Sequence, residues 1–156
     1  MLFRSIDPGL ARLGYGVIKV ERDGVSPLTY GCLQTPAAMS AGERLLAMYE
    51  GITALFLQYH PDCIAVERLF FAKNVTSAMS VSEVRGVLLL AAEQQGIPVT
   101  EYTPNQVKQA ITGSGKADKR QVQEMICRLL HLDTVPRPDD AADGLSIALC
   151  HIHIMR

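Results

Sequence analysis

The sequence lacks the charge excess of a basic nucleic-acid binder, the long apolar run of a membrane protein and the apolar segment of a signal peptide. It has 15 lysines and arginines against 16 acidic residues, so the formal net charge is −1 and bulk charge does not indicate a nucleic-acid binder. No apolar run approaches the roughly 18 residues of a membrane span, and the N-terminus lacks the apolar segment of a signal peptide. We therefore expect a soluble, cytoplasmic protein.

Cysteine pairs at metal-binding spacing are also missing. Cys32, Cys63, Cys127 and Cys150 include no Cys-x-x-Cys sequence. That spacing is typical of zinc sites and redox motifs, so the sequence predicts neither of them. Because most of these cysteines sit in apolar runs, we expect reduced thiols in the core.

Strand and helix patterns fill the whole sequence. With 156 residues and 48% hydrophobic composition, residues 1–156 are expected to form a single domain with its own core. Turn signals separate three early strands, expected as an antiparallel meander over 2–7, 14–20 and 28–35. Further strands are expected over 62–67 and 97–102, and helices over 41–59, 74–95, 104–111, 117–130 and 138–154. The last two strands are joined through a helix, which predicts a parallel pair.

Four acidic residues occupy positions where an unpaired carboxylate would be costly. Asp7 and Glu67 each close an apolar run, and Asp140 and Asp143 fall at the start of the last expected helix. A buried carboxylate is unfavourable unless it is paired or bound to a cation, and four that converge would repel one another. Hard oxygen ligands favour magnesium or manganese, so the pattern predicts a metal site.

Each of these acids also has a purely structural explanation. Asp7 begins an Asp-Pro-Gly sequence of the kind common in turns, and Glu67 could simply be solvated. Asp140 and Asp143 share a helix face, in a first turn where the macrodipole favours acids. Asp139 also shares a face with Asp143, at a spacing of four, so either Asp139 or Asp140 fits as the ligand.

The order of the elements, together with five local motifs, resembles one known family. The expected order is three antiparallel strands, then helix, strand, helix, strand and helix, with acids on two strand ends and on the last helix. This order is similar to the ribonuclease H-like fold. In order and spacing the motifs resemble the RuvC Holliday-junction resolvases over essentially the whole chain. They are Ile6-Asp7-Pro8-Gly9 with Gly14-Tyr15-Gly16-Val17, then Val66-Glu67-Arg68-Leu69-Phe70-Phe71-Ala72-Lys73-Asn74, Arg85-Gly86, Gln106-Val107-Lys108-Gln109 and Asp140-Ala141-Ala142-Asp143.

This resemblance implies both a fold and a chemistry. The implied fold is α/β, with a mixed five-stranded sheet of three antiparallel strands plus parallel strands, flanked by helices. The implied activity is that of a homodimer that nicks two opposing strands of a four-way DNA junction during recombination and repair, working with the RuvA and RuvB branch-migration proteins. Asp7, Glu67, Asp140 and Asp143 match the family's catalytic acids. They would hold two Mg²⁺ or Mn²⁺ ions for hydrolysis to 5′-phosphate and 3′-hydroxyl ends.

Local charge and the resemblance together predict DNA contacts. Residues 104–131 carry five cations against two acids, a surplus that would track phosphates, although solvated helix faces would look the same. Gly113 and Gly115 would let backbone amides approach a phosphate. Phe70 matches a family residue that stacks on an unpaired base at the junction centre. The other expected contacts are Lys73, Asn74, Arg85, Lys108, Lys116, Lys119 and Arg120.

Two further expectations concern helices. The segment 87–92 is apolar nearly all round, which favours a dimer interface, or alternatively a helix enclosed within one subunit. Gly144 is a poor helix former, and we expect it to cost on the order of 1 kcal/mol and to loosen the turn that carries Asp143. Two other functions stay open: a non-catalytic junction-binding module, and a nuclease of the same fold that acts on RNA.

Overall fold

The computed structural model describes residues 2–5, 12–68 and 75–155. Three strands come first, strands and helices then alternate as far as β5, and three helices follow, within a few residues of the ranges expected from the sequence. The elements are β1 (Leu2–Ser5), β2 (Arg12–Glu21), β3 (Gly24–Gln34), α1 (Ala41–Tyr59), β4 (Ile64–Glu67), α2 (Val75–Gln94), β5 (Val99–Tyr102), α3 (Pro104–Thr112), α4 (Lys119–Leu129) and α5 (Asp139–Met155).

The strands form one mixed sheet in the order β3-β2-β1-β4-β5. β1 pairs antiparallel with β2, and β2 with β3, so the expected meander is confirmed. β4 runs parallel to both β1 and β5, which confirms the expected parallel pair. This arrangement places β1 at the centre of the sheet, beside the strand that ends at Glu67. The α/β class expected from the sequence is confirmed.

The β2–β3 hairpin is longer than the sequence pattern indicated. We expected β3 to begin at position 28, but it begins at Gly24 and includes Pro27. Proline cannot donate a ladder hydrogen bond and is tolerated mainly on edge strands or at bulges. β3 is an edge strand, and the register shifts opposite Pro27, between Val17 and Ile18. The proline therefore lies within the strand without breaking the hairpin.

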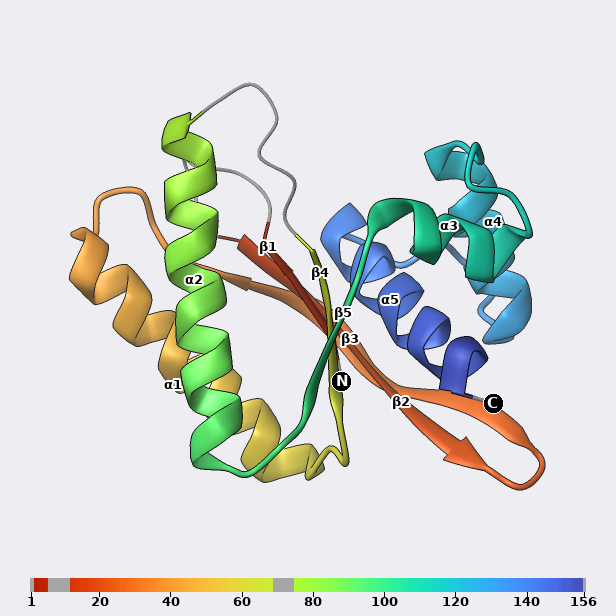
Figure 1. Ribbon diagram of the computed structural model, residues 1–156, viewed down its shortest axis with the longest axis horizontal. Helices are drawn as coiled ribbons and strands as arrows, with labels where there is room; N and C mark the ends of the chain where they lie inside the picture. The colour runs from red at the N-terminus through yellow and green to blue at the C-terminus, as the bar shows by residue number, and fades with distance from the viewer. Residues whose placement is uncertain (1, 6–11, 69–74, 156) are drawn as a thin grey trace.

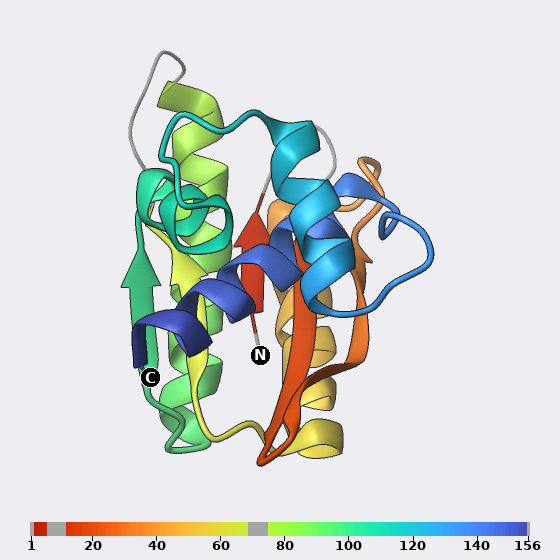
Figure 2. The same cartoon turned by 90° about the vertical axis from the view of Figure 1, so that its right-hand side faces the viewer.

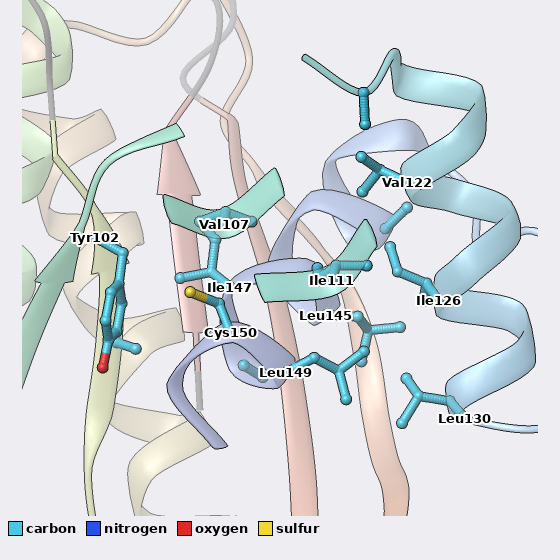
Figure 3. Packing of buried hydrophobic residues seen from close by; sticks show 14 residues of the cluster. Tyr102, Val107, Ile111, Val122, Ile126, Leu130, Leu145, Ile147, Leu149 and Cys150 are labelled. Atoms are coloured by element: carbon cyan, nitrogen blue, oxygen red, sulfur yellow. The ribbon is translucent and has the colours of Figure 1, made fainter. Parts of the chain in front are cut away.

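The helices cover the sheet in two layers (Figure 1). α1 and α2 lie on one face, and α3, α4 and α5 lie on the other, with α5 crossing the strands (Figure 2). Successive residues of β4 point to opposite faces, so Ile64 and Val66 join the core under α1 and α2. Ala65 joins the second core, under α3 to α5. Figure 3 shows the packing of that core. By the same alternation, Glu67 points to the face that carries α5.

Glycines bring the start of α5 into backbone contact with β2. A Cβ added at Gly144 would lie 2.5 Å from the carbonyl carbon of Tyr15, and one at Gly14 would overlap the backbone of Asp140. Gly144 therefore has a packing role that its low helix propensity did not indicate. Its missing side chain is what allows α5 to pack this closely, and the contact fixes the turn that carries Asp140 and Asp143.

The four cysteines agree only partly with the expectation of reduced thiols in the core. All four cysteines lie in the described part of the chain and form no disulfide. Only Cys150 is fully buried, so the expectation of four core cysteines is wrong for Cys32, Cys63 and Cys127, which are half-buried.

Among the described helices, none is both long and apolar enough to cross a membrane.

Candidate active site

Two of the four acids predicted from the sequence meet in one cleft. Glu67, at the end of β4, and Asp143, in the second turn of α5, both line a cleft of about 260 Å³. Lys108 of α3 and Lys119 of α4 line the same cleft. Elements from distant parts of the sequence thus bring two carboxylates and two cations together on the α5 side of the sheet.

The pairing of β4 with β5 fixes the position of Glu67. Glu67 lies opposite Tyr102 in the parallel ladder, and the next amide, that of Arg68, donates to the Tyr102 carbonyl oxygen at 2.7 Å. Backbone hydrogen bonds therefore continue past the residue that carries the carboxylate. A functional side chain on a strand end held in this way is better positioned than one on a loop.

Capping boxes fix the two helices that supply the cations. Thr103 Oγ1 accepts from the Gln106 amide at 3.2 Å, and Asp118 Oδ1 accepts from the Gln121 amide at 2.8 Å. Each such cap stabilises its helix by about 1 kcal/mol. Lys119 directly follows the cap of α4, so the start of that helix is held where its side chain reaches the cleft.

Asp140 is the one buried acid among the residues whose burial the structure describes. Only 7% of its surface is exposed, and Cys32 Sγ lies 3.9 Å from its Oδ2. Burial raises the pKa of the Cys32 thiol, and the neighbouring Asp140 carboxylate raises that pKa further. Holding a carboxylate here is costly without a positive partner, which is the situation that a bound cation relieves.

Asp139, the other candidate ligand, is engaged in ion pairs at the surface. Lys119 Nζ lies 2.9 Å from its Oδ2, and Arg137 Nη1 lies 2.5 Å from its Oδ1. The hydrogen bond from Lys119 is the main reason that the pKa of Asp139 is lowered below its ordinary value. The neighbouring acids Asp139 and Asp140 thus have different surroundings, one beside two cations and the other buried against β2 and β3.

The chemistry of the acids fits a hard divalent cation, but the described residues alone do not complete a metal site. Carboxylate oxygens are the ligands that Mg²⁺ and Mn²⁺ prefer. In the ranges 2–5, 12–68 and 75–155, no three His, Cys, Asp or Glu side chains are grouped closely enough to hold a metal. Asp7, the fourth predicted ligand, lies outside these ranges, as do Phe70, Lys73 and Asn74.

The remaining predicted DNA contacts lie away from the cleft. Lys116 lines a separate pocket of about 420 Å³ between α3 and α4, together with Arg128. Arg120 is 87% exposed at its side chain and pairs with Glu124 at 2.9 Å. The structure therefore brings Lys108 and Lys119 into the cleft of the acids, and leaves Lys116 and Arg120 outside its lining.

Arg85 forms an ion pair with Glu101 of β5. Arg68, which the sequence analysis did not single out, lies 3.5 Å from the same carboxylate. Its position directly after Glu67 in the sequence could have indicated that Arg68 lies near the site. The cleft also contains Gln123 and Ser146, which were likewise missed. Ser146 lies three residues after Asp143 and so shares its helix face.

Gln109 already satisfies the two loop amides that were expected to approach a phosphate, one through its backbone carbonyl and one through its side chain. The Gly113 amide donates to the Gln109 carbonyl oxygen at 2.9 Å, which ends α3 in a left-handed cap. The Gly115 amide donates to Gln109 Oε1, also at 2.9 Å. The expected role of these two glycines in phosphate binding is therefore not supported, because both donors are used within the loop.

The sequence matches the family model described as crossover junction endodeoxyribonuclease RuvC over residues 4–151. The chain belongs to the RuvC family. A RuvC from Desulfitobacterium hafniense is 52% identical over 98% of this chain and 93% of its own length. One from Chloroflexus aggregans is 56% identical over 96% of this chain and 91% of its own length.

Solved RuvC structures share the fold as well. The Thermus thermophilus RuvC structure aligns with a TM-score of 0.89 and 35% identity, over 99% of this chain and 95% of that chain. The same organism's RuvC in complex with a Holliday junction substrate aligns with a TM-score of 0.87 and 34% identity, over 99% and 94% of the two chains. Membership of this endodeoxyribonuclease family agrees with the resemblance found in the sequence motifs.

Proposed function

We propose that this protein resolves four-way (Holliday) DNA junctions by nicking two opposing strands during recombination and repair. The observation that carries the proposal is the cleft in which Glu67 and Asp143 face Lys108 and Lys119, in a chain of the RuvC family. Acids and cations in one cleft suit a phosphodiester, because the cations bind the anionic phosphate while the acids bind the metal that activates water. The cleft belongs to a single ribonuclease H-like domain.

Asp7, Glu67, Asp140 and Asp143 would hold two divalent cations, preferably Mg²⁺ with Mn²⁺ as a substitute. Such a pair of cations supplies an activated water and stabilises the leaving oxygen of an in-line displacement, which yields 5′-phosphate and 3′-hydroxyl ends. Asp140 is preferred over Asp139 because it is 7% exposed, whereas Asp139 is engaged by Lys119 and Arg137. A carboxylate already bound to two cations has less to gain from a metal.

The lysines of the cleft orient the scissile phosphate in this proposal. Lys108 and Lys119 reach the cleft from two different helices, so they can contact a phosphate from two sides. Arg85, Lys116 and Arg120 would contact more distant phosphates, where such contacts position the protein on the DNA. Phe70, Lys73 and Asn74 keep the roles that the family resemblance gives them.

We also infer a homodimer, which places two such clefts on one junction. Large apolar side chains are exposed on α1 and α2, the two helices on the face of the sheet opposite the cleft (Figure 1). They are Leu46 (56% exposed), Leu57 (56%), Met79 (62%) and Leu90 (56%). Symmetric dimers are the commonest oligomers, and two symmetric nicks need two active sites. Cooperation with RuvA and RuvB rests on family membership alone.

The test uses purified protein with a labelled mobile four-way junction, and with a linear duplex and an RNA duplex of matching sequence. Products are resolved on denaturing gels, with Mg²⁺ present or chelated. Paired nicks at symmetric positions, only on the junction and only with metal, are expected. Binding without cutting at any junction sequence would favour a non-catalytic module. Equal cutting of the linear or RNA substrate would favour a general nuclease of the same fold.

A further inference from the structure

A cysteine, a histidine and a tyrosine that do not line the acidic cleft are joined by hydrogen bonds. Cys63 Sγ is 3.1 Å from His151 Nε2, and Tyr102 Oη is 2.8 Å from His151 Nδ1. The Tyr102 and His151 rings meet edge to face, with centroids 5.8 Å apart. Cys63 directly precedes β4, whereas Glu67 ends it, so the thiol and the acid lie at opposite ends of the strand. Tyr102 pairs with Glu67 in the ladder, and its hydroxyl bonds to the histidine that contacts the thiol.

Three elements of the fold hold this cluster together. Tyr102 ends β5, Cys63 leads into β4, and His151 lies in the last turns of α5. Tyr102 is only 4% exposed and belongs to the core under α3 to α5, where Figure 3 shows it on the β5 side of that core. Cys63 and His151 are each half-buried. The tyrosine is thus fixed by packing, while the thiol and imidazole remain reachable from solvent.

The two ring nitrogens of His151 are suited to different tasks. When Nδ1–H donates to Tyr102 Oη, the lone pair of Nε2 faces the Cys63 thiol and can accept its proton. Burial lowers the pKa of His151, which keeps the imidazole neutral and able to accept near neutral pH. The thiolate, not the thiol, is the nucleophile, so a base in contact with the sulfur favours reaction.

We propose that Cys63, His151 and Tyr102 form a base-assisted thiol site that exchanges with small disulfides. Cys63 Sγ attacks one sulfur of a disulfide RSSR while its proton passes to His151 Nε2. The S–S bond of RSSR breaks, and the leaving RS⁻ takes that proton and departs as RSH. Cys63 is left in a mixed disulfide with R. Tyr102 is a positioning residue that holds the histidine in the accepting tautomer.

The other three thiols provide comparisons within the same chain. Cys150 is buried, and burial raises its pKa to about 11. The pKa of Cys32 is raised by burial and by Asp140. Cys127 is half-buried in α4, as Cys63 is beside β4, and is the matched comparison for exposure. Reactivity set by exposure alone would therefore give Cys63 and Cys127 similar rates.

The test exposes the folded wild-type protein to limiting Ellman's reagent and identifies the modified cysteines over time by mass spectrometry. Cys63 is expected to react at least about tenfold faster than Cys127, in line with assistance by a positioned base. Equal rates at the two thiols, or a faster reaction at Cys127, would overturn the proposal. The same experiment with oxidised glutathione should modify the same cysteine first.

Two variants then separate the base from simple packing. His151→Gln keeps a polar side chain of similar size, and it should slow Cys63 about tenfold while leaving Cys127 unchanged. Added free imidazole should restore part of that rate. Tyr102→Phe keeps the ring. It should lower the ratio of the Cys63 rate to the Cys127 rate by less than His151→Gln does. An unchanged Cys63 rate in His151→Gln would exclude the base, and the wild-type comparison decides the proposal if either variant fails to fold.

Discussion

Lys119 Nζ lies 2.9 Å from Oδ2 of Asp139, so the first residue of α4 is paired with the first residue of α5. Lys119 also lines the cleft that contains Glu67 and Asp143. The ion pair therefore holds a cation at the rim of the acidic cleft, and it joins the two helices that form one wall. It also separates the roles of Asp139 and Asp140, which the sequence alone leaves open.

Asp140→Asn should abolish activity, whereas Asp139→Asn should leave it nearly unchanged. Asp139 pairs with cations at the surface, so its loss should cost no more than about 1 kcal/mol of folding free energy and leave junction cutting within a few-fold of wild type. Asp140→Asn removes the buried carboxylate and should abolish cutting. Junction-cleavage rates under saturating Mg²⁺ measure both. Lost cutting in Asp139→Asn with retained cutting in Asp140→Asn would reverse the assignment.

The Asp139 ion pairs also predict a pH dependence of stability. The pKa of Asp139 is lowered from its ordinary value of 3.8, chiefly by the hydrogen bond from Lys119. A lowered folded-state pKa contributes stability that is present above the unfolded-state pKa and is lost as the pH falls through the folded-state pKa. Urea unfolding should therefore show wild type more stable than Asp139→Asn near neutral pH. The difference should shrink as the pH is lowered below 3.8. A difference that grows on acidification would contradict the ion-pair account.

Gly144→Ala should destabilise the protein although alanine is the better helix former. The new Cβ would lie 2.5 Å from the Tyr15 carbonyl carbon, so α5 must move away from β2, at a cost of about 1–3 kcal/mol. Gly42→Ala is the matched control, because a Cβ at this position in α1 meets nothing within 4 Å. Gly42→Ala should leave stability unchanged or raise it by up to about 1 kcal/mol. Urea unfolding compares the two, and a stabilised Gly144→Ala would disprove the close contact.

Leu90→Glu should convert the proposed dimer to a monomer. Leu90 is 56% exposed on α2, so the substitution adds a charge to the proposed interface without disturbing the core. Ile154→Glu is the control, since Ile154 is 50% exposed on α5, on the other side of the sheet. Sedimentation velocity should show monomers for Leu90→Glu and dimers for wild type and Ile154→Glu. A wild-type monomer at all accessible concentrations would refute the dimer.

Much of the framework could be predicted from the sequence because it depends on local patterns. An apolar run located β4 and its terminal Glu67, and helical spacing put Asp140 and Asp143 on one face of α5. Parallel pairing of β4 and β5 followed from the helix that joins them. The meeting of Glu67 with Asp143 was accessible mainly through the resemblance to a family. Nothing local in the two segments specifies that they are neighbours.

Contacts between side chains of distant elements could not be predicted in this way. The shared use of Glu101 by Arg68 and Arg85 depends on side-chain rotamers across α2 and β5. Helix propensity alone did not indicate the packing role of Gly144, because propensity ignores how closely another backbone approaches. In the same way, the donors of Gly113 and Gly115 looked available until Gln109 was seen to occupy both.

In the proposed function the acids of the cleft cut DNA that other residues bind, and the variant Asp143→Asn separates cutting from binding. Binding to a labelled four-way junction is measured by gel shift, and cutting of the same junction is measured with Mg²⁺. The variant should bind at least as tightly as wild type, because it removes a negative charge beside the phosphates, and it should not cut. Cutting at the wild-type rate, or binding lost in parallel with cutting, would contradict the account.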